Sequence, residues 1–221
     1  MRQLVWALVA VGVAAWVFQQ VRKPSGWLGR RIARAMNLSH AALTEWGLQQ
    51  IMVPKSAVIL DVGCGGGQTV RRLTALAPEV MVIGLDYSDA SVAVSRDTNA
   101  KEIAAGRVQI RHGSIAALPF PDSTFDIVTA VETHYYWPDL PSNVREILRV
   151  LKPGGTFALI AETYRGGPFR LLYGVVMPLL RAALLTDAEH RELLQQAGFT
   201  EVATMHRRGT NWICATGHRP P

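Results

Sequence analysis

The apolar residues of this chain fall into short runs that alternate with amphipathic stretches. Runs rich in Val and Ile and bounded by Gly, Pro, Asp or Ser predict strands at 57–60, 80–85, 108–111, 125–131 and 156–161. Helical spacing between the runs predicts helices at 41–51, 69–76, 89–105 and 140–151. Alternating strands and helices are typical of a parallel sheet covered on both faces, which predicts a doubly wound α/β fold.

The last part of the chain predicts a helix followed by a hairpin. Thr186 is followed three residues later by Glu189, which is the spacing of a capping box, so a helix should begin there and stop at Gly198. Apolar runs at 199–206 and 211–216 predict two further strands joined by a short turn. This hairpin would close the sheet.

The first 24 residues differ from the rest in hydropathy. Arg2 and Arg22 enclose 19 uncharged residues, which as a helix would extend roughly 28 Å, close to the thickness of a bilayer core. Trp6 and Trp16 lie toward the ends of this segment, as in an aromatic belt. We therefore expect a hydrophobic membrane anchor at 1–24 and a domain at 25–221, with a cleaved signal peptide and a buried helix as alternatives.

Charge and composition exclude several protein classes. With 49% apolar and 18% charged residues, the 221-residue chain has the composition of a packed globular protein. Its net charge of +6 arises from basic residues before position 35, and the first acidic residue is Glu45. The remaining body is balanced in charge, which argues against binding to nucleic acid. The basic cluster that follows the apolar segment predicts, by the positive-inside rule, that the domain lies in the cytoplasm. Two distant cysteines, Cys64 and Cys214, provide no disulfide framework.

A glycine-rich segment follows the first predicted strand. It begins at Asp61 and carries glycines at 63, 65, 66 and 67, so its backbone can approach a ligand closely. Asp86 lies 19 residues after Gly67, at the end of the second predicted strand. A carboxylate at that place accepts hydrogen bonds from both hydroxyls of a ribose. Together the loop and Asp86 predict an adenosine site.

The spacing of the glycines indicates which adenosine ligand binds. A dinucleotide fingerprint requires glycine at the sixth position, where this chain has Gln68 counting from Gly63 and Val70 counting from Gly65. The pattern present is D-x-G-x-G-x-G, headed by an acidic residue that would repel a pyrophosphate. The register therefore argues against an NAD-dependent oxidoreductase, which is the first alternative function.

Four segments together resemble the class I S-adenosylmethionine-dependent methyltransferases, in particular the small-molecule type that includes quinone-biosynthesis methyltransferases. The segments are 60–67, 84–88, 118–126 and 148–155, supported by 186–189 and 196–199 near the end. The resemblance covers about residues 36 to 216. It implies a Rossmann-like, seven-stranded, mostly parallel sheet with one antiparallel strand.

The resemblance also implies how S-adenosylmethionine is bound. The loop backbone would hold the methionine part, Asp86 the ribose, and Tyr87 would pack beside the adenine. The adenine amino group would meet the Ser114 hydroxyl or the backbone at Ser114 and Ile115, where many relatives carry an acidic residue. The implied cofactor-binding residues are Asp61, Gly63, Cys64, Gly65, Gly67, Asp86, Tyr87, Ser114 and Ile115.

The segment 132–138 follows the fourth predicted strand and would face the methyl group from the acceptor side. Glu132 or His134 could act as a general base there, with the neighbouring aromatic residues as a wall. The alternative is that the aromatic residues belong to the core and that His134 makes only structural hydrogen bonds. The other histidines have no ligand spacing, so no metal site is expected, and Cys64 is expected to be a small loop residue.

The strongly apolar segment at 164–185 lies where the family builds a lid over the acceptor. Its composition suits an apolar acceptor or a membrane surface, although a plain pair of core helices would have the same composition. We therefore expect a membrane-anchored enzyme with its domain in the cytoplasm, which methylates a small apolar acceptor. A non-catalytic S-adenosylmethionine-binding module is the second alternative.

Overall fold

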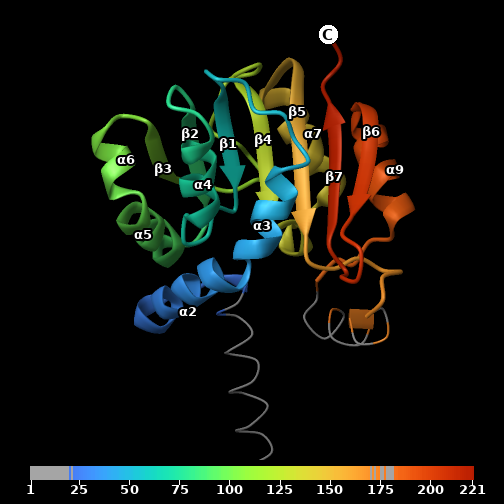
Figure 1. Cartoon of the computed structure of the whole chain (residues 1–221), viewed down its shortest axis with the longest axis horizontal. Helices are drawn as coiled ribbons and strands as arrows, with labels where there is room; N and C mark the ends of the chain where they lie inside the picture. Colours follow the sequence, from blue (N-terminus) through green and yellow to red (C-terminus); the bar gives the residue numbers. More distant parts are fainter. Residues whose placement is uncertain (1–19, 21, 170, 172, 175–176, 178–181) are drawn as a thin grey trace, which may run out of the picture.

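A seven-stranded sheet with strand order β3-β2-β1-β4-β5-β7-β6 runs through the domain (Figure 1). The computed structural model describes residues 20, 22–169, 171, 173–174, 177 and 182–221. Neighbouring strands are parallel, except that β7 is antiparallel to both β5 and β6. The strands are β1 (Val58–Val62), β2 (Met81–Asp86), β3 (Val108–His112), β4 (Phe125–Val131), β5 (Leu151–Ala161), β6 (Thr200–His206) and β7 (Ile213–His218). This confirms the sheet with one antiparallel strand.

Helices cover both faces of this sheet. They are α2 (Gly26–Ser39), α3 (Ala41–Leu48), α4 (Gln68–Leu76), α5 (Asp89–Thr98), α6 (Ala100–Ala104), α7 (Leu140–Val150) and α9 (Asp187–Ala197), with a short 3-10 helix η1 (His134–Tyr136). One buried cluster includes Leu43 of α3 and Leu73 of α4, and the other includes Ile147 of α7 and Leu194 of α9. The sheet therefore buries an apolar layer on each side.

The predicted helix at 89–105 is wrong in one respect, because it is interrupted at Asn99. The Asn99 side-chain amide donates to the carbonyl oxygens of Ser95, at 2.9 Å, and Gly67, at 3.0 Å. Asn99 itself has φ −111° and ψ 17°, so α5 ends and α6 begins beside it. Its side chain thus ties this break to the glycine loop, a contact that local periodicity does not encode.

Strand β5 begins at Leu151, five residues before the predicted start. Leu151, which precedes Lys-Pro-Gly-Gly at 152–155, already pairs with Phe125 of β4. The register between the two strands then shifts, and this irregularity accommodates Gly154 with its φ of +73°. The glycines therefore lie within a bulged strand rather than before it.

The hydrophobic helix predicted at 1–24 lies outside the described residues, apart from residue 20 and residues 22–24. Among the helices that the structure does describe, none is both long enough and apolar enough to span a bilayer. The described chain enters the domain through residues 22–25 and then forms α2, a helix that the sequence analysis did not predict.

The capping box at the start of α9 is confirmed. The Thr186 hydroxyl accepts a hydrogen bond from the Glu189 amide at 3.1 Å, and the Glu189 carboxylate accepts one from the Thr186 amide at 2.6 Å. We expect Thr186→Ala to lower the free energy of unfolding by about 1 kcal/mol, measured by urea denaturation. Gln196→Ala, on the exposed side of the same helix, should change it by less than about 0.5 kcal/mol. Equal losses in both variants would contradict the role of the cap.

Candidate active site

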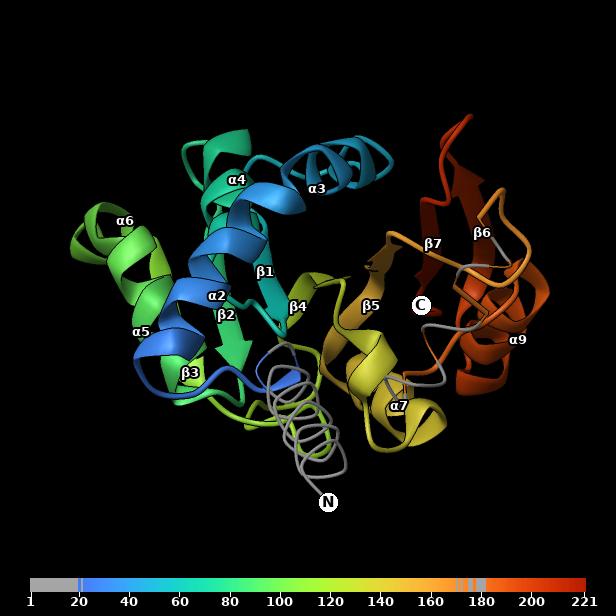
Figure 2. The same cartoon turned by 90° about the horizontal axis from the view of Figure 1, so that it is seen from below.

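A cavity of about 300 Å³ opens at the carboxyl ends of β1, β2 and β4. Its wall combines the glycine loop, the end of β2, the segment after β4 and residues of α2. In Figure 1, α2 lies beneath the arrowheads of β1 and β2, and Figure 2 shows it crossing those strand ends. Ligands of open parallel sheets bind at this edge, outside the carboxyl ends of the strands.

The glycine loop between β1 and α4 presents bare backbone to the cavity. Gly63, Gly65 and Gly67 have φ values of +70°, +51° and +82°. The amides of Gly63 and Cys64 donate to the Leu85 carbonyl at 2.7 and 3.0 Å, which fixes the loop against β2. A Cβ added at Gly63 would lie 2.2 Å from Thr133 Oγ1, whereas one at Gly65 would meet nothing within 4 Å. Because Gly65 also lines the cavity, the loop leaves room there for a ligand.

Asp86 ends β2 with its carboxylate at the cavity wall and only 6% of the residue exposed. Oδ2 accepts a hydrogen bond from the Gly65 amide and Oδ1 accepts one from the Ser88 amide, both at 2.9 Å. Burial raises the pKa of Asp86, although these hydrogen bonds lower it. A carboxylate has about four acceptor positions, so each oxygen retains capacity for a ligand hydroxyl.

Asp61 lies beneath the loop and does not line the cavity. Thr129 donates to its Oδ1 at 2.7 Å, while Oδ2 has no hydrogen-bond partner among the described residues. Burial raises the pKa of Asp61 to about 7, the Thr129 hydrogen bond lowers it, and the nearby Asp86 raises it further. Two coupled carboxyl groups at this end of the cavity favour a cationic ligand.

The remaining residues predicted to bind the cofactor lie around the same cavity. Tyr87, Ser114, Ile115 and Cys64 all line it. The Cys64 thiol is buried, and burial raises its pKa well above the usual value, so Cys64 is an unreactive loop residue rather than a nucleophile. Seven of the nine predicted cofactor-binding positions therefore line the cavity. Gly67 belongs to the same loop without lining the cavity, and Asp61 lies on the strand before that loop.

Residues 22–25 and α2 form one side of the cavity, here called the roof, and this part of the site was not predicted from the sequence. The Tyr87 hydroxyl donates to the Arg22 carbonyl, and the Ser88 hydroxyl donates to the Pro24 carbonyl at 2.5 Å. Further along, the Asn37 amide donates to the Gly66 carbonyl at 2.9 Å. These contacts join the chain before α2, and α2 itself, to the glycine loop and to the end of β2. No local pattern signals them, since the partners lie far apart in sequence.

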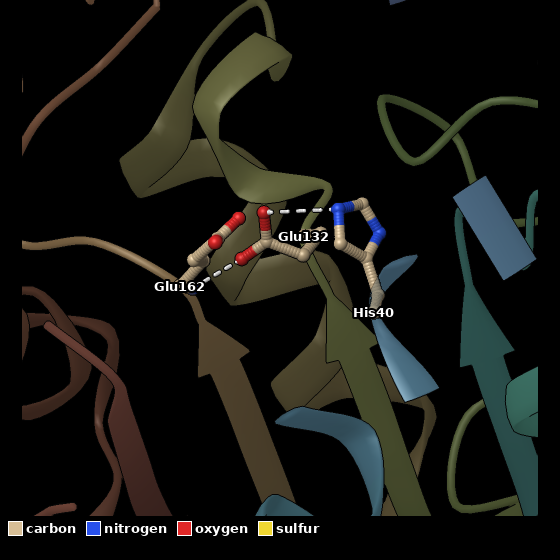
Figure 3. A group of neighbouring side chains, drawn as sticks. All are labelled: His40, Glu132 and Glu162. Atoms are coloured by element: carbon tan, nitrogen blue, oxygen red, sulfur yellow. Dashed lines mark hydrogen bonds and ion pairs between the residues drawn. The ribbon is translucent and has the colours of Figure 1, made fainter. Parts of the chain in front are cut away.

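Glu132 follows β4 with a φ of +58°, which is uncommon for a residue other than glycine. Its Oε1 accepts hydrogen bonds from the Glu162 amide and from the Tyr135 hydroxyl, and its Oε2 faces His40 Nε2 at 4.0 Å (Figure 3). Burial raises the pKa of Glu132 to about 8, and the Glu162 carboxylate raises it further while the hydrogen bonds oppose both effects. Glu132 therefore lies in the cavity wall as a readily protonated carboxyl group.

His134, the other predicted base, does not line the cavity. Its ring is fully buried, and neither ring nitrogen has a hydrogen-bond partner among the described residues. It packs against Tyr135 and His190, with ring centroids 4.2 and 5.5 Å away. Burial lowers the pKa of His134 well below the usual value. His134 therefore lies away from the cavity that a general base would have to reach, and it also lacks, among the described residues, the structural hydrogen bonds that the alternative predicted.

The aromatic residues after Glu132 divide between core and cavity. Tyr135 is buried, whereas Tyr136 and Trp137 line the cavity as predicted for the acceptor wall. The Trp137 indole donates to Thr133 Oγ1 at 3.2 Å, which fixes the ring.

The predicted lid at 164–185 is described only in part. Among its described residues none lines the cavity, and Tyr173, Met177 and Leu184 pack against the core cluster beside α7 and α9. These residues follow the core-helix alternative, and the rest of the lid prediction lies outside the described residues.

Three side chains from distant segments meet where His40 and Glu132 line the cavity wall. His40, Glu132 and Glu162 place one potential ligand atom each within 4.8 Å of one another (Figure 3). His40 and Glu162 lie far from Glu132 in sequence, so no short ligand spacing in the sequence signals this cluster. Their residue types could hold a cation or share a proton.

Comparisons with known proteins agree with this geometry. A sequence profile described as a methyltransferase domain matches residues 60–159. The chain is 31% identical over 177 residues to the demethylmenaquinone methyltransferase of Listeria welshimeri, covering 75% of each chain. It is 39% identical to the 27-O-demethylrifamycin SV methyltransferase of Amycolatopsis mediterranei, over 46% of this chain and only 37% of that protein.

Solved structures share the fold. A chain from the Haloferax volcanii complex of the Trm112 methyltransferase activator matches with a TM-score of 0.76 and 21% identity, over 88% of this chain and 96% of that chain. The phosphoethanolamine-type N-methyltransferase 2 of Haemonchus contortus, solved with S-adenosylhomocysteine, matches with a TM-score of 0.70 and 17% identity, over 81% and 53% of the two chains.

Proposed function

The chain belongs to the class I S-adenosylmethionine-dependent methyltransferases, and from this premise we propose that it methylates a small apolar acceptor at a membrane. It is an enzyme related to the quinone-biosynthesis methyltransferases. The nature of the acceptor, the site residues and the membrane association are the parts proposed here.

The observation that carries the proposal is the pairing of a bare glycine loop with Asp86 in one cavity wall. We assign the ribose hydroxyls to Asp86, because both of its oxygens retain acceptor capacity. The backbone from Gly63 to Gly67 would hold the methionine part, close to the carboxyl group of Asp86. Tyr87, Ser114 and Ile115 line the far side and would surround the adenine.

When bound, S-adenosylmethionine supplies an activated methyl group on a sulfonium, so the protein needs mainly to position the acceptor. Holding two reactants in near-attack geometry can contribute roughly 7 to 11 kcal/mol to catalysis. Calorimetric titration with S-adenosylmethionine and with NADH tests the assignment. Preferential binding of NADH would remove it.

An apolar acceptor is supported by the apolar part of the cavity wall that α2 and the segment after β4 form. Tyr136, Trp137 and Val131 come from the end of β4 and beyond, and Met36 and Ala33 come from α2. Such a wall suits a flat or aliphatic group with few polar contacts. Incubating the protein with radiolabelled S-adenosylmethionine and a lipid extract should place the label in the organic phase. Label found only in water-soluble products would contradict an apolar acceptor.

Membrane association is supported by the outer side of α2 as well as by the apolar segment before it. Arg30, Arg31 and Arg34 are exposed on this helix, and Trp27 is 67% exposed. Basic residues beside an exposed tryptophan suit an anionic lipid surface. We therefore propose that the domain lies on the cytoplasmic side of a membrane. Full-length protein that stays in the supernatant with anionic vesicles would contradict this.

The roof predicts a modest role for the Tyr87 hydroxyl in cofactor affinity. Tyr87→Phe removes the hydrogen bond to the Arg22 carbonyl but keeps the ring, so a single neutral hydrogen bond is lost. We expect affinity for S-adenosylmethionine to fall roughly two- to tenfold, measured by calorimetry. Tyr164→Phe, which lies outside the cavity lining, is the control and should bind like the unchanged protein. An unchanged affinity for Tyr87→Phe would mean that the roof does not act on this ligand.

A further inference from the structure

His40 lies at the junction of α2 and α3, within the cavity wall, and was not a candidate in the sequence analysis. We propose that His40 and Glu132 form a catalytic pair, in which His40 takes the proton that the acceptor loses during methylation and Glu132 positions the imidazole. This inference rests on the proposed function. It also narrows the acceptor to a group that carries an ionisable proton, such as a hydroxyl on an apolar ring.

The backbone around His40 holds its side chain at the cavity. The His40 amide donates to the Met36 carbonyl at 3.2 Å, and the His40 carbonyl accepts from the amide and the hydroxyl of Thr44, both at 2.9 Å. One turn earlier, Asn37 is hydrogen-bonded to Gly66 of the glycine loop. The backbone that carries His40 is therefore held close to the loop that is proposed to hold the cofactor.

Glu132 is held so that one oxygen is left for His40. Its Oε1 is occupied by the Glu162 amide and the Tyr135 hydroxyl, while Oε2 faces His40 Nε2 at 4.0 Å. Figure 3 shows the second ring nitrogen of His40 on the side away from Glu132. A positive φ at Glu132 is a costly conformation, and such conformations cluster at functional sites. In this arrangement His40 is the base, and the Glu132 carboxylate faces the ring nitrogen that is turned away from the acceptor.

The proton balance of the reaction defines the role of His40. The acceptor oxygen forms a bond to the methyl carbon while the bond from that carbon to sulfur breaks, and the electron pair of the broken bond stays on sulfur. The acceptor hydroxyl loses its proton to Nδ1 of neutral His40. The imidazolium that results faces the Glu132 carboxylate, so the new positive charge is balanced within the pair.

The charges around the pair make its action depend on pH. Four other titratable groups lie around Glu132: Glu162, which directly follows β5, Tyr135 and Tyr136 of η1, and Tyr173. Burial lowers the pKa of His40, so the ring is neutral and can accept a proton, although Glu162 opposes this effect. Because the pKa of Glu132 is raised to about 8, the carboxylate that balances an imidazolium forms as the pH rises through that value.

The test compares His40→Asn with the unchanged full-length protein in detergent, using tritiated S-adenosylmethionine and 1,4-naphthalenediol as the probe acceptor. His206→Asn, on β6 and outside the cavity lining, is the matched control. Each protein is assayed from pH 6 to 10 with and without EDTA, and its affinity for S-adenosylmethionine is measured by calorimetry. In parallel, NMR follows the His40 ring signals with pH in the sinefungin complex, with and without Glu132→Gln.

We expect His40→Asn to methylate the probe roughly 10² to 10³ times more slowly than the unchanged protein, with unchanged cofactor affinity. The His40 signals should show a step near pH 8 that Glu132→Gln removes. If His40→Asn methylates the probe at the full rate, the catalytic pair is overturned. The pair is also overturned if EDTA removes the activity and a divalent metal restores it, since His40, Glu132 and Glu162 would then hold a cation. If the unchanged protein does not methylate the probe, the pH dependence of the His40 NMR signals serves as the test. The absence of a step near pH 8 would then overturn the catalytic pair. Failure of the unchanged protein to bind S-adenosylmethionine would instead overturn the proposed function.

Discussion

Replacing Asp86 with alanine is expected to lower the affinity for S-adenosylmethionine roughly 10²- to 10³-fold. The carboxylate is proposed to accept hydrogen bonds from the ribose, and hydrogen bonds to a charged group are worth about 1.5 to 3 kcal/mol each. It also accepts the amides of Gly65 and Ser88, so its loss loosens the glycine loop and the start of α5. Both effects weaken binding. Calorimetric titration of the purified variant measures the change.

The control for this variant is Asp89→Asn, three residues further along. The Asp89 side chain is 97% exposed and lies 3.6 Å from His112 Nε2, its one ion-pair partner among the described residues. The Asp89→Asn substitution removes the same charge from the same region without changing the cavity wall. The affinity for S-adenosylmethionine should therefore stay within about twofold, because an exposed ion pair contributes little. Since Asp86→Ala could unfold the start of α5, circular dichroism should accompany the titration. Tight binding by a folded Asp86→Ala protein would refute the assignment of the ribose.

The glycine loop and Asp86 could be predicted because their chemistry is local in sequence. Each follows a strand directly, and parallel strands bring their carboxyl ends to one edge of the sheet. The glycine spacing alone separated this loop from a dinucleotide fingerprint. Strand positions were likewise predictable from apolar runs, since burial on both faces leaves little choice of side chain.

His40 and the roof could not be predicted for the opposite reason. His40 meets Glu132 only because α2 folds back across the strand ends, and Asn37 contacts Gly66 across 29 residues of sequence. A helix of mixed composition at 26–39 carries no signal of where it will pack. The same reasoning applies to His134, which lies close to Glu132 in sequence but is fully buried and does not line the cavity. Proximity along the chain after a strand does not fix the direction of each side chain.

The second large effect is expected for Glu132→Gln, which should slow methyl transfer roughly 10²-fold or more above pH 8 and yet stabilise the fold. Glutamine keeps an oxygen for the Glu162 amide and the Tyr135 hydroxyl, so packing and hydrogen bonds are retained. It cannot become an anion, however, and therefore cannot balance a charged His40. Cofactor affinity should not change, because Glu132 lies on the acceptor side.

The sign of the stability effect follows from the raised pKa of Glu132. Its pKa rises from an ordinary 4.5 to about 8 in the folded protein, so the native state favours the protonated form. The stability contributed by that form is complete below the unfolded pKa and is lost as the pH rises through about 8. Glutamine is neutral at every pH, so the Glu132→Gln variant keeps this stability across the whole pH range. A pKa shift of this size corresponds to a difference in the free energy of unfolding of at most about 5 kcal/mol. Because the carboxyl group borders the cavity and is not wholly shielded from solvent, we expect Glu132→Gln to gain about 1 to 3 kcal/mol at pH 9.

Urea denaturation of Glu132→Gln at pH 5, 7 and 9 measures this gain in the free energy of unfolding. The control is Glu192→Gln, at an exposed position of α9. The Glu132 variant should gain stability over the unchanged protein as the pH increases, whereas the Glu192 variant should follow the unchanged protein. A gain in stability together with a loss of activity is expected of a buried functional carboxylate, because the same desolvation that makes its charge costly makes that charge effective in catalysis. If Glu132→Gln is instead less stable at pH 9, the residue serves the fold and not the reaction.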